Sequence, residues 1–447
     1  MKKIALKIIF YGKYVRYIFY RSIGYVGAYI KNNVPFLFTR LKPLFPDFKP
    51  DSVFLLKLQR KQLIERLNGR FHRTRIKKYE KKGFIFRKKL LSIADEVVVC
   101  GNPENVFFIP PRIMSAPVDS ELFGCWPKGS FQLERPFISR VAKAELVSEY
   151  AWGFTKERTF IFETGIFFWE GFVFPYRNYE KELEYLDIPV TTTYDHTVVS
   201  LVNKYSFGNY YHWVIERLTL LEAVEVYERE KGIRPKLLVH AGILSWQKEL
   251  LAMLGYIESD YLYWHGGRVK VQNLLVPSVR RYQESERTPV DSLSPQACKW
   301  LRAKAFNALE KRIARKVFSK RIYISRYKDS FRRLLNEDQF VELLNTFGFE
   351  RYYLVGMSLQ DQIDLFAGAE IIIAQHGAAL TNLLWASKGT RVLEIQNESY
   401  FEHSHVYYQI SNALELEYMT VVLENKNDDF DSLVNLNEFS KVLREII

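Results

Sequence analysis

The stretch Glu370–Ile395 reads EIIIAQHGAALTNLLWASKGTRVLEI and carries the clearest fold signal in the chain. Its first residues predict a buried strand over Glu370–Ala374, and the small residues after it predict a turn into a helix over Ala378–Trp385. A second apolar strand is predicted over Arg391–Ile395. Short apolar strands that alternate with helices are typical of a parallel sheet covered by helices on both faces.

The same alternation extends in both directions from this stretch. In the C-terminal part, strands are predicted over Arg321–Ser325, Glu350–Leu354 and Tyr418–Val421, and helices over Glu337–Phe347, Ser358–Phe366 and His405–Leu414. An earlier series has strands over Thr159–Glu163, Gly171–Phe174, Thr197–Val202, Lys236–His240, Tyr261–Trp264 and Val269–Val276, and helices over Tyr210–Glu228 and Ser245–Leu254. The polar, proline-containing segment Pro277–Pro295 separates the two series, and a helix over Gln296–Lys316 follows it.

The predicted fold class is therefore α/β, with two Rossmann-like domains that face a cleft and a basic helical N-terminal extension. We expect the extension over residues 1–95, one α/β domain over residues 96–285 and the second over residues 286–447. The proline-rich stretch Gly101–Pro136 is predicted to be a linker or an extended wrap around the next domain. Ligands of such folds bind outside the carboxyl ends of the strands.

The composition excludes several classes of protein. The chain has 447 residues, of which 48% are hydrophobic and 26% are charged, so it is neither disordered nor collagen-like. Its three cysteines, Cys100, Cys125 and Cys298, cannot form a disulfide framework or a zinc ribbon. Few cysteines, together with the lack of a convincing secretory signal, predict a cytoplasmic protein.

The positive charge is concentrated at the N-terminus. Residues 1–90 contain 24 Lys and Arg against 4 Asp and Glu, whereas the rest of the chain contains 40 against 47. The longest uncharged run before residue 46 is Ser22–Ile30, which is too short to span a bilayer. Apolar residues recur there at helical spacing, with lysines and arginines outside the stripe: Ile4, Ile8, Tyr11, Val15 and Ile18.

This pattern favours an amphipathic helix on an anionic membrane surface, reached through residues 1–50. Two alternatives remain, which are a helix packed on the protein itself and a nucleic-acid-binding arm. The remaining chain is mildly acidic, which does not suit a polyanion binder, so no nucleic-acid partner is predicted.

The turn after the first quoted strand suits a phosphate. Small residues at a strand-to-helix turn allow backbone N–H groups to approach a ligand, and the helix N-terminus adds partial positive charge. We expect His376, Gly377 and Ala378 to form this turn and Asn382 to lie on its helix. The alternative is a tight turn with a structural histidine.

Arginines follow the strand Arg321–Ser325, again at its carboxyl end. Arg326, Arg333 and Asn336 are candidates for phosphate binding, because a guanidinium group binds phosphate with two parallel hydrogen bonds. Some of these arginines could instead form surface ion pairs. Glu394 closes a later strand and could accept hydrogen bonds from ribose hydroxyls.

His212 and Glu216 lie four residues apart on the predicted helix after Thr197–Val202, so they share one face. A histidine beside a carboxylate is a reasonable general base. The same spacing could contribute to a metal site, but no further ligands are evident, so neither a metal nor a cofactor is predicted. The alternative is that both residues pack or cap the helix.

Three ordered segments resemble the family 61 glycosyltransferases, which include bacterial capsule and exopolysaccharide enzymes. These are NYYHWVIERL, RIYISR followed by RRLLNEDQFVELLNTFGFE, and SLQDQIDLFAGAEIIIAQHGAALTNLLWASKGTRVLEI. The resemblance covers roughly residues 195–425. Trp385 stands where Phe is common in the family and Gln375 where Pro is common, and neither change removes a charge.

The resemblance implies a GT-B fold and an inverting, metal-independent transfer from a nucleotide sugar. It places Arg326, Arg333 and Asn336 at the donor diphosphate, and Glu394 at the nucleoside. His376, Gly377, Ala378 and Asn382 would form the phosphate turn and its helix. His212 and Glu216 would lie on the acceptor side.

We therefore expect a glycosyltransferase at the inner face of a bacterial cytoplasmic membrane. Its partners would be a nucleotide-sugar donor and a glycan or lipid-linked oligosaccharide acceptor for capsule, exopolysaccharide or lipopolysaccharide. The alternative is a non-catalytic subunit of a polysaccharide assembly complex that binds a nucleotide sugar or glycan without turnover.

Overall fold

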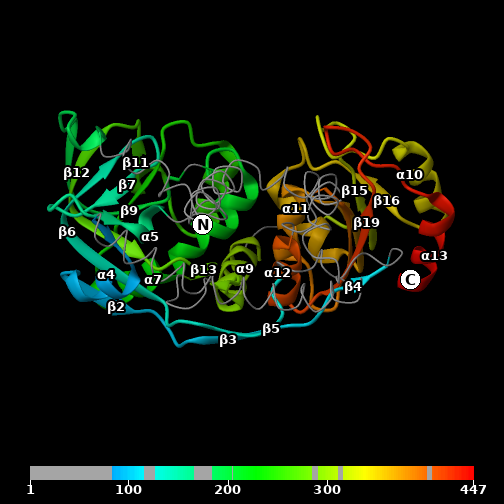
Figure 1. Ribbon diagram of the computed structural model, residues 1–447, viewed down its shortest axis with the longest axis horizontal. Coiled ribbons are helices and arrows are strands. Elements are labelled where there is room, and N and C mark those ends of the chain that lie inside the picture. Colours follow the sequence, from blue (N-terminus) through cyan, green and yellow to red (C-terminus); the bar gives the residue numbers. More distant parts are fainter. Residues whose placement is uncertain are drawn as a thin grey trace, which may run out of the picture. The chain divides into compact units, whose positions relative to one another are not determined.

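The computed structural model describes residues 83–114, 126–165, 184–203, 205–283, 290–310, 316–399 and 405–447 (Figure 1). The chain divides into two compact units, Met1–Arg70 and Phe71–Ile447, and all of the described residues belong to the second unit. The predicted N-terminal amphipathic helix and the predicted strand Gly171–Phe174 lie outside the described residues. Within these ranges, no helix is long and apolar enough to cross a membrane.

The C-terminal sheet has six strands, all parallel, in the order β16-β15-β17-β18-β19-β4. The strands are β15 (Arg321–Ile324), β16 (Glu350–Tyr352), β17 (Ile371–Gln375), β18 (Arg391–Asn397), β19 (Glu417–Leu423) and β4 (Arg112–Ile113). The helices of this part are α10 (Glu337–Thr346), α11 (Leu359–Gly368), α12 (Val406–Ala413) and α13 (Leu436–Ile446). The direction of strand order reverses between β15 and β17. Ligands of doubly wound sheets bind at the carboxyl ends of the strands at this reversal.

The N-terminal sheet has nine strands and is mixed. Its order is β1-β8-β7-β6-β12-β9-β10-β11, with β2 also paired to β6. The strands are β1 (Phe84–Ile85), β2 (Glu96–Val99), β6 (Phe137–Val147), β7 (Trp152–Phe154), β8 (Phe160–Ile161), β9 (Thr192–Ser200), β10 (Lys236–His240), β11 (Tyr261–Trp264) and β12 (Arg268–Pro277). The strands β12, β9, β10 and β11 are parallel, as the alternation predicts, whereas β6 runs antiparallel to β12.

The proline-rich stretch contains regular structure. Strands β3 (Glu104–Phe108) and β5 (Gly129–Leu133) form a two-stranded antiparallel ribbon, and β4 joins the C-terminal sheet beside β19. The Tyr408 hydroxyl of α12 donates to the Ile109 carbonyl at 2.7 Å, and the Asn412 side chain donates to the Phe107 carbonyl at 3.0 Å. The ribbon therefore connects the two sheets and is bonded to a helix of the second.

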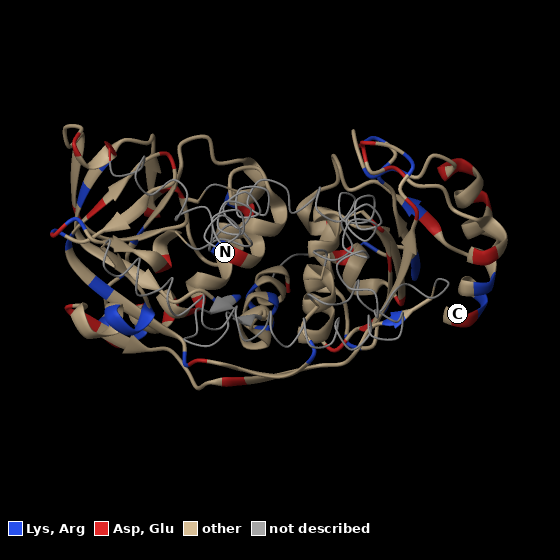
Figure 2. Ribbon diagram, in the orientation of Figure 1, with Lys and Arg blue, Asp and Glu red and all other residues tan. Residues whose placement is uncertain are grey.

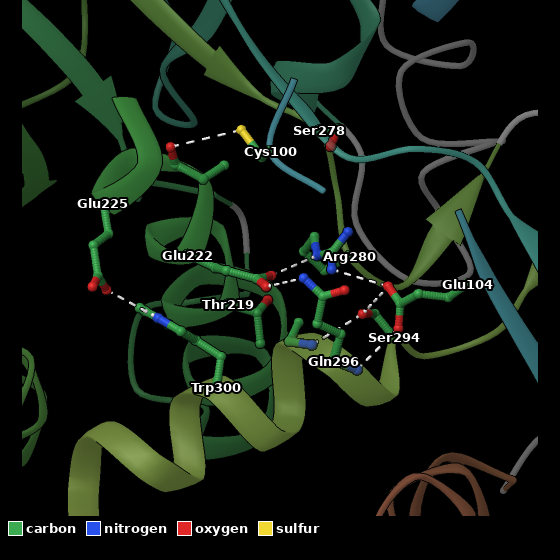
Figure 3. A network of polar contacts seen from close by, with 12 residues as sticks. Cys100, Glu104, Thr219, Glu222, Glu225, Ser278, Arg280, Ser294, Gln296 and Trp300 are labelled. Atoms are coloured by element: carbon green, nitrogen blue, oxygen red, sulfur yellow. Dashed lines mark hydrogen bonds and ion pairs between the residues drawn. The ribbon is translucent and has the colours of Figure 1, made fainter. Parts of the chain in front are cut away.

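A buried ionic network lies where the ribbon meets α7 (Leu221–Lys231) and α9 (Pro295–Leu309) (Figure 3). Arg280 pairs with Glu104 and with Glu222, each at 3.0 Å. Glu104 also accepts from the Ser294 hydroxyl at 2.6 Å and from the Gln296 N–H at 2.9 Å, so it satisfies donors at the N-terminus of α9.

Three predicted helices and one predicted strand differ in detail. The one predicted over Tyr210–Glu228 begins as a π-helix, η4 (His212–Arg217), and continues through the 3₁₀ turn η5 (Leu218–Leu220) into α7. The segment Ala378–Trp385 is the 3₁₀ helix η7, because its turns close with i to i+3 bonds such as Leu380 N–H to Gly377 O. Helix α9 ends at Leu309, and Lys316 is not helical. The predicted strand Thr159–Glu163 is shorter, and its last residues begin the helical turn α5 (Phe162–Gly165).

Candidate functional site

His212 opens the π-helix that follows β9. The Asn209 side chain accepts from the His212 backbone N–H at 3.2 Å and holds the first turn. The wide π turn brings His212 Nδ1 to 2.9 Å from a Glu216 carboxylate oxygen, so the predicted pair forms. π-Helical turns in proteins often occur at functional sites.

Glu216 is held from its other side by a buried arginine. Arg281 Nη1 lies 3.2 Å from the second Glu216 oxygen. Burial alone raises the pKa of Glu216, but the positive charges of His212, Arg281 and Arg217 outweigh burial and lower this pKa to about 2. Glu216 is therefore ionised. An ionised carboxylate beside Nδ1 favours the neutral His212 tautomer with its proton on Nδ1, which leaves Nε2 as the nitrogen that accepts.

Arg326 and His376 follow β15 and β17, the two strands at the reversal of strand order. The Arg326 guanidinium lies directly against Gly377, where an added methyl group would overlap its Nη1. Gly377 has extended backbone geometry, with φ 169°, which any residue can adopt. A glycine is therefore needed here to make room for the Arg326 side chain.

His376 forms a second histidine–carboxylate pair. Its Nδ1 lies 2.6 Å from Glu394 Oε1, and the Tyr418 hydroxyl donates to Glu394 Oε2 at 2.6 Å. Both oxygens of the buried Glu394 therefore have protein partners, and its observed contacts orient His376. Burial lowers the pKa of His376, Glu394 opposes this shift, and the nearby Arg332 and Arg326 lower the pKa further.

The two adjacent arginines, Arg332 and Arg333, have different surroundings. Arg333 forms a hydrogen-bonded ion pair with Asp431 at 2.7 Å. Arg332 has a left-handed backbone, with φ 59°, and its Nη1 reaches the His376 carbonyl oxygen at 3.5 Å. Its guanidinium also lies 4.6 Å from the centre of the Phe331 ring, and that of Arg326 lies 5.6 Å from the same centre. Arg332 is thus the second arginine beside His376.

The last two predicted donor-side amides, Asn336 and Asn382, are both hydrogen-bonded within the protein. The Asn336 side chain bonds to the backbone N–H and carbonyl of Val434. Asn382 is buried and accepts from the Tyr210 hydroxyl at 3.0 Å and from Trp385 Nε1 at 3.0 Å. Asn382 therefore links η7 to the residues that precede the π-helix. Ala378 is partly buried at the first position of η7.

Aromatic rings connect the two histidines. The ring of Tyr211 lies 5.5 Å from that of His212 and 5.8 Å from that of Tyr407, and the ring of Tyr407 lies 5.1 Å from that of His376. The arrangement brings a histidine–carboxylate pair from the first sheet and a group of cations from the second toward the same pair of tyrosines. Among the described residues, no group of three His, Cys, Asp or Glu could hold a metal ion.

A comparison with protein-family sequence models finds a match over this region. The sequence model of Glycosyltransferase 61 matches residues 210–393. This segment belongs to glycosyltransferase family 61. The match begins at Tyr210, two residues before His212, and includes Arg326, Arg332 and His376. Glu394, Tyr407 and Tyr418 follow the matched segment. No curated protein matches the chain. Family membership implies glycosyltransferase activity.

Sequence reasoning missed two residues of this site, Arg281 and Arg332. Arg281 lies in the segment interpreted as a domain boundary, and nothing local indicates that it contacts Glu216. Arg332 precedes the candidate Arg333 in the sequence, but its contact with His376 depends on its own left-handed backbone and on the distant Asp431, which bonds to Arg333. The positions of Arg326 and His376 could be predicted, because both follow recognisable strands.

Proposed function

We propose that the protein is an inverting, metal-independent glycosyltransferase that moves a sugar from a nucleotide-sugar donor to a hydroxyl of a glycan acceptor. The observation that carries this proposal is the convergence of the His212–Glu216 pair and the arginines beside His376 within a family 61 segment. The GT-B arrangement, with two Rossmann-like domains, is part of the proposal. The doubly wound order of the C-terminal sheet supports it.

His212 is the proposed general base. Its Nε2 would take the proton of the acceptor hydroxyl while the acceptor oxygen forms a bond to the anomeric carbon of the donor. Ionised Glu216 at 2.9 Å would stabilise the imidazolium that results. Attack opposite to the departing phosphate inverts the configuration at the anomeric carbon.

The leaving group is a nucleoside diphosphate, which departs with the electron pair of the broken carbon–oxygen bond. Arg326 and Arg332 would supply positive charge to its phosphates, and the start of η7 would add backbone donors. Fixed positive charge of this kind can stabilise a departing diphosphate without a metal ion. Glu394 would act through His376, since both of its oxygens already have protein partners.

The acceptor side of the proposal follows from the sequence. The strongly basic N-terminal segment suits an anionic membrane surface, and a lipid-linked oligosaccharide is an acceptor that a membrane-associated enzyme can reach. We therefore propose a place at the inner face of a bacterial cytoplasmic membrane, in the synthesis of capsule, exopolysaccharide or lipopolysaccharide. Nucleic acid is not a proposed partner.

Thermal unfolding with a panel of nucleotides and nucleotide sugars, in EDTA, tests donor binding. We expect one nucleoside diphosphate and its sugar to raise the melting temperature, because a ligand that binds only the folded state stabilises it by mass action. The slow release of nucleoside diphosphate with water as acceptor then tests turnover. Binding without release, in the presence of candidate acceptors, would favour the non-catalytic alternative.

The variant His212→Ala separates the two steps. General-base loss predicts a decrease in turnover of about 10²–10⁴-fold with nucleotide affinity nearly unchanged. His196→Ala, at an exposed position on β9, is the matched control and should leave turnover unchanged. Full turnover in the His212 variant would contradict the assigned base.

A further inference from the structure

The first helix and strands of the described chain expose several large apolar side chains. Along β2 and β3, alternate residues point outward, and Phe107 and Ile109 are 62% and 67% exposed. The residues between them, such as Val98, Val106 and Phe108, are buried. We call the outward set the apolar strip, and it consists of Leu91 and Ile93 of helix α4 (Arg87–Ile93) together with Val97, Val99, Phe107 and Ile109.

The exposure of the strip is built into the fold. The carbonyl groups of Phe107 and Ile109 are both hydrogen-bonded by α12, through Asn412 and Tyr408. Phe108, between them, packs its ring against that of Tyr408. The backbone is therefore fixed with two large apolar side chains on its outer side. A ribbon held in this way offers a defined surface to a partner.

We propose that the apolar strip docks on an anionic membrane surface. Residues 1–82, which directly precede this part of the chain, contain 21 Lys and Arg against 4 Asp and Glu. Lys88 and Lys89 are exposed on α4, next to Leu91 and Ile93, and Figure 2 shows α4 blue while the ribbon is mostly uncharged. Lysines at the headgroups and apolar side chains at the acyl boundary are the combination that binds an anionic bilayer.

The same observations disfavour a second copy of the chain as the occupant. Two copies that met through this strip would bring the exposed Lys88 and Lys89 of both copies to one interface. Pairing of β3 edges is also disfavoured, because Pro103 precedes this strand and Pro110 and Pro111 follow it, and proline has no N–H to donate. The proposal does not depend on the sugar transfer.

Vesicle co-sedimentation of the full chain tests the proposal. Vesicles contain phosphatidylcholine with or without an equal amount of phosphatidylglycerol, and 0.5 M salt shortens the screening length to about 4 Å, which weakens the purely electrostatic contribution. We expect the double variant Phe107→Ser/Ile109→Ser to partition into the anionic vesicles at least tenfold more weakly than the unmodified protein.

The matched control is Ile257→Ser/Val355→Ser, which removes two apolar side chains of similar or greater exposure, 62% and 82%, outside the strip. The control should partition like the unmodified protein, and both variants should keep the melting temperature and its increase with nucleoside diphosphate. If the double variant fails to fold, Ile109→Ser alone should weaken partitioning about threefold.

Three results would overturn the proposal. One is equal partitioning of the strip variant and the unmodified protein, and another is an unmodified protein that does not bind anionic vesicles. The third is a change from dimer to monomer in light scattering when the strip is altered, which would assign the strip to contact between copies. If the unmodified protein bound no nucleotide, this result would count against the proposed sugar transfer but would not affect the vesicle test.

Discussion

At the scale of single residues, each histidine of the site is held through Nδ1 by a carboxylate, but the group behind that carboxylate differs. Arg281 stands behind Glu216, whereas the Tyr418 hydroxyl stands behind Glu394. When His212 takes up a proton, the ionised Glu216 carboxylate stabilises the imidazolium that forms. Burial lowers the pKa of His376 and two nearby arginines lower it further, which favours its neutral form although Glu394 opposes the shift. The first environment suits a base, and the second suits the binding of an anion.

Gly377→Ala should separate ligand affinity from stability. The added methyl group overlaps the end of the Arg326 side chain, which can rotate away at little cost in folding free energy. We expect at least a tenfold loss of nucleoside diphosphate affinity by calorimetry, with a stability change of less than about 1 kcal/mol. Gly368→Ala is the control, because no atom lies near the added methyl group there. Unchanged affinity in Gly377→Ala would remove Arg326 from the phosphate site.

The adjacent arginines allow an equally direct comparison. Arg332→Ala removes a cation next to His376 and should weaken nucleotide binding by about tenfold or more, as for loss of a charge-assisted hydrogen bond. Arg333→Ala removes the partner of buried Asp431 and should lower the melting temperature with affinity within about threefold of the original. Calorimetry and thermal unfolding measure the two effects. The reverse pattern would restore the sequence-based assignment of Arg333.

At the scale of elements, local signals predicted some strands well and others not at all. Strands β10 and β11 were predicted with their observed bounds, because each is a short apolar run between turns. Strand β6 was missed, since Arg140 and Glu145 interrupt its apolar pattern. Each of these charges is paired with a residue of another strand, Glu96 or Arg268, so only the assembled sheet makes this sequence compatible with a central strand.

The irregular elements of the site depended on distant partners. The π turn at His212 forms against buried Arg281, which lies on another segment. The ribbon of β3 and β5 depends on cross-strand bonds and on contacts with α12, none of which is visible in a proline-rich stretch. The turn after β17 was predictable because its strand and its small residues are adjacent in sequence.

The network that joins the ribbon to α7 and α9 should make stability depend on pH when its cation is removed. Arg280→Met leaves Glu104 and Glu222 buried without their shared partner, and we expect a loss of about 3–5 kcal/mol at pH 7. Burial already raises the pKa of Glu222 in the folded protein, and the loss of Arg280 raises it further. When the pKa of a carboxyl group is higher in the folded than in the unfolded protein, folding stability falls as the pH rises from the unfolded pKa, about 4.5, to the folded pKa.

The stability difference between Arg280→Met and the unmodified protein should therefore be largest at neutral pH and should shrink toward pH 5. Urea unfolding at several pH values measures it. Lys304→Met is a suitable control, because its ion pair with Glu225 is partly exposed and contributes little. A difference that does not change with pH would mean that the network is held by packing rather than by charge.

At the scale of the whole molecule, the main hydrophobic core of the described residues extends across both sheets. It contains Leu237 and Val239 of β10 as well as Ile372 and Ala374 of β17. Helix α9 belongs to the same core through four residues of its buried face, which are Cys298, Leu301, Ala305 and Leu309. Two sheets that share one core and one helix should unfold together. A substitution in α9 should therefore lower the protection of both sheets from hydrogen exchange.

Leu301→Ala tests this expectation by hydrogen exchange. Leu301 is 1% exposed, so its truncation should cost about 2–5 kcal/mol, and peptides from β10 and from β17 should lose the same amount of protection. Leu433→Ala, at a position that is 45% exposed, is the control and should leave both peptides nearly unchanged. A nucleoside diphosphate bound beside β17 should in turn protect β10 in the unmodified protein, because both strands exchange through the same opening. Protection confined to the β17 peptide would show that the two sheets unfold independently, and the core would then not couple the donor site to the segment that carries His212.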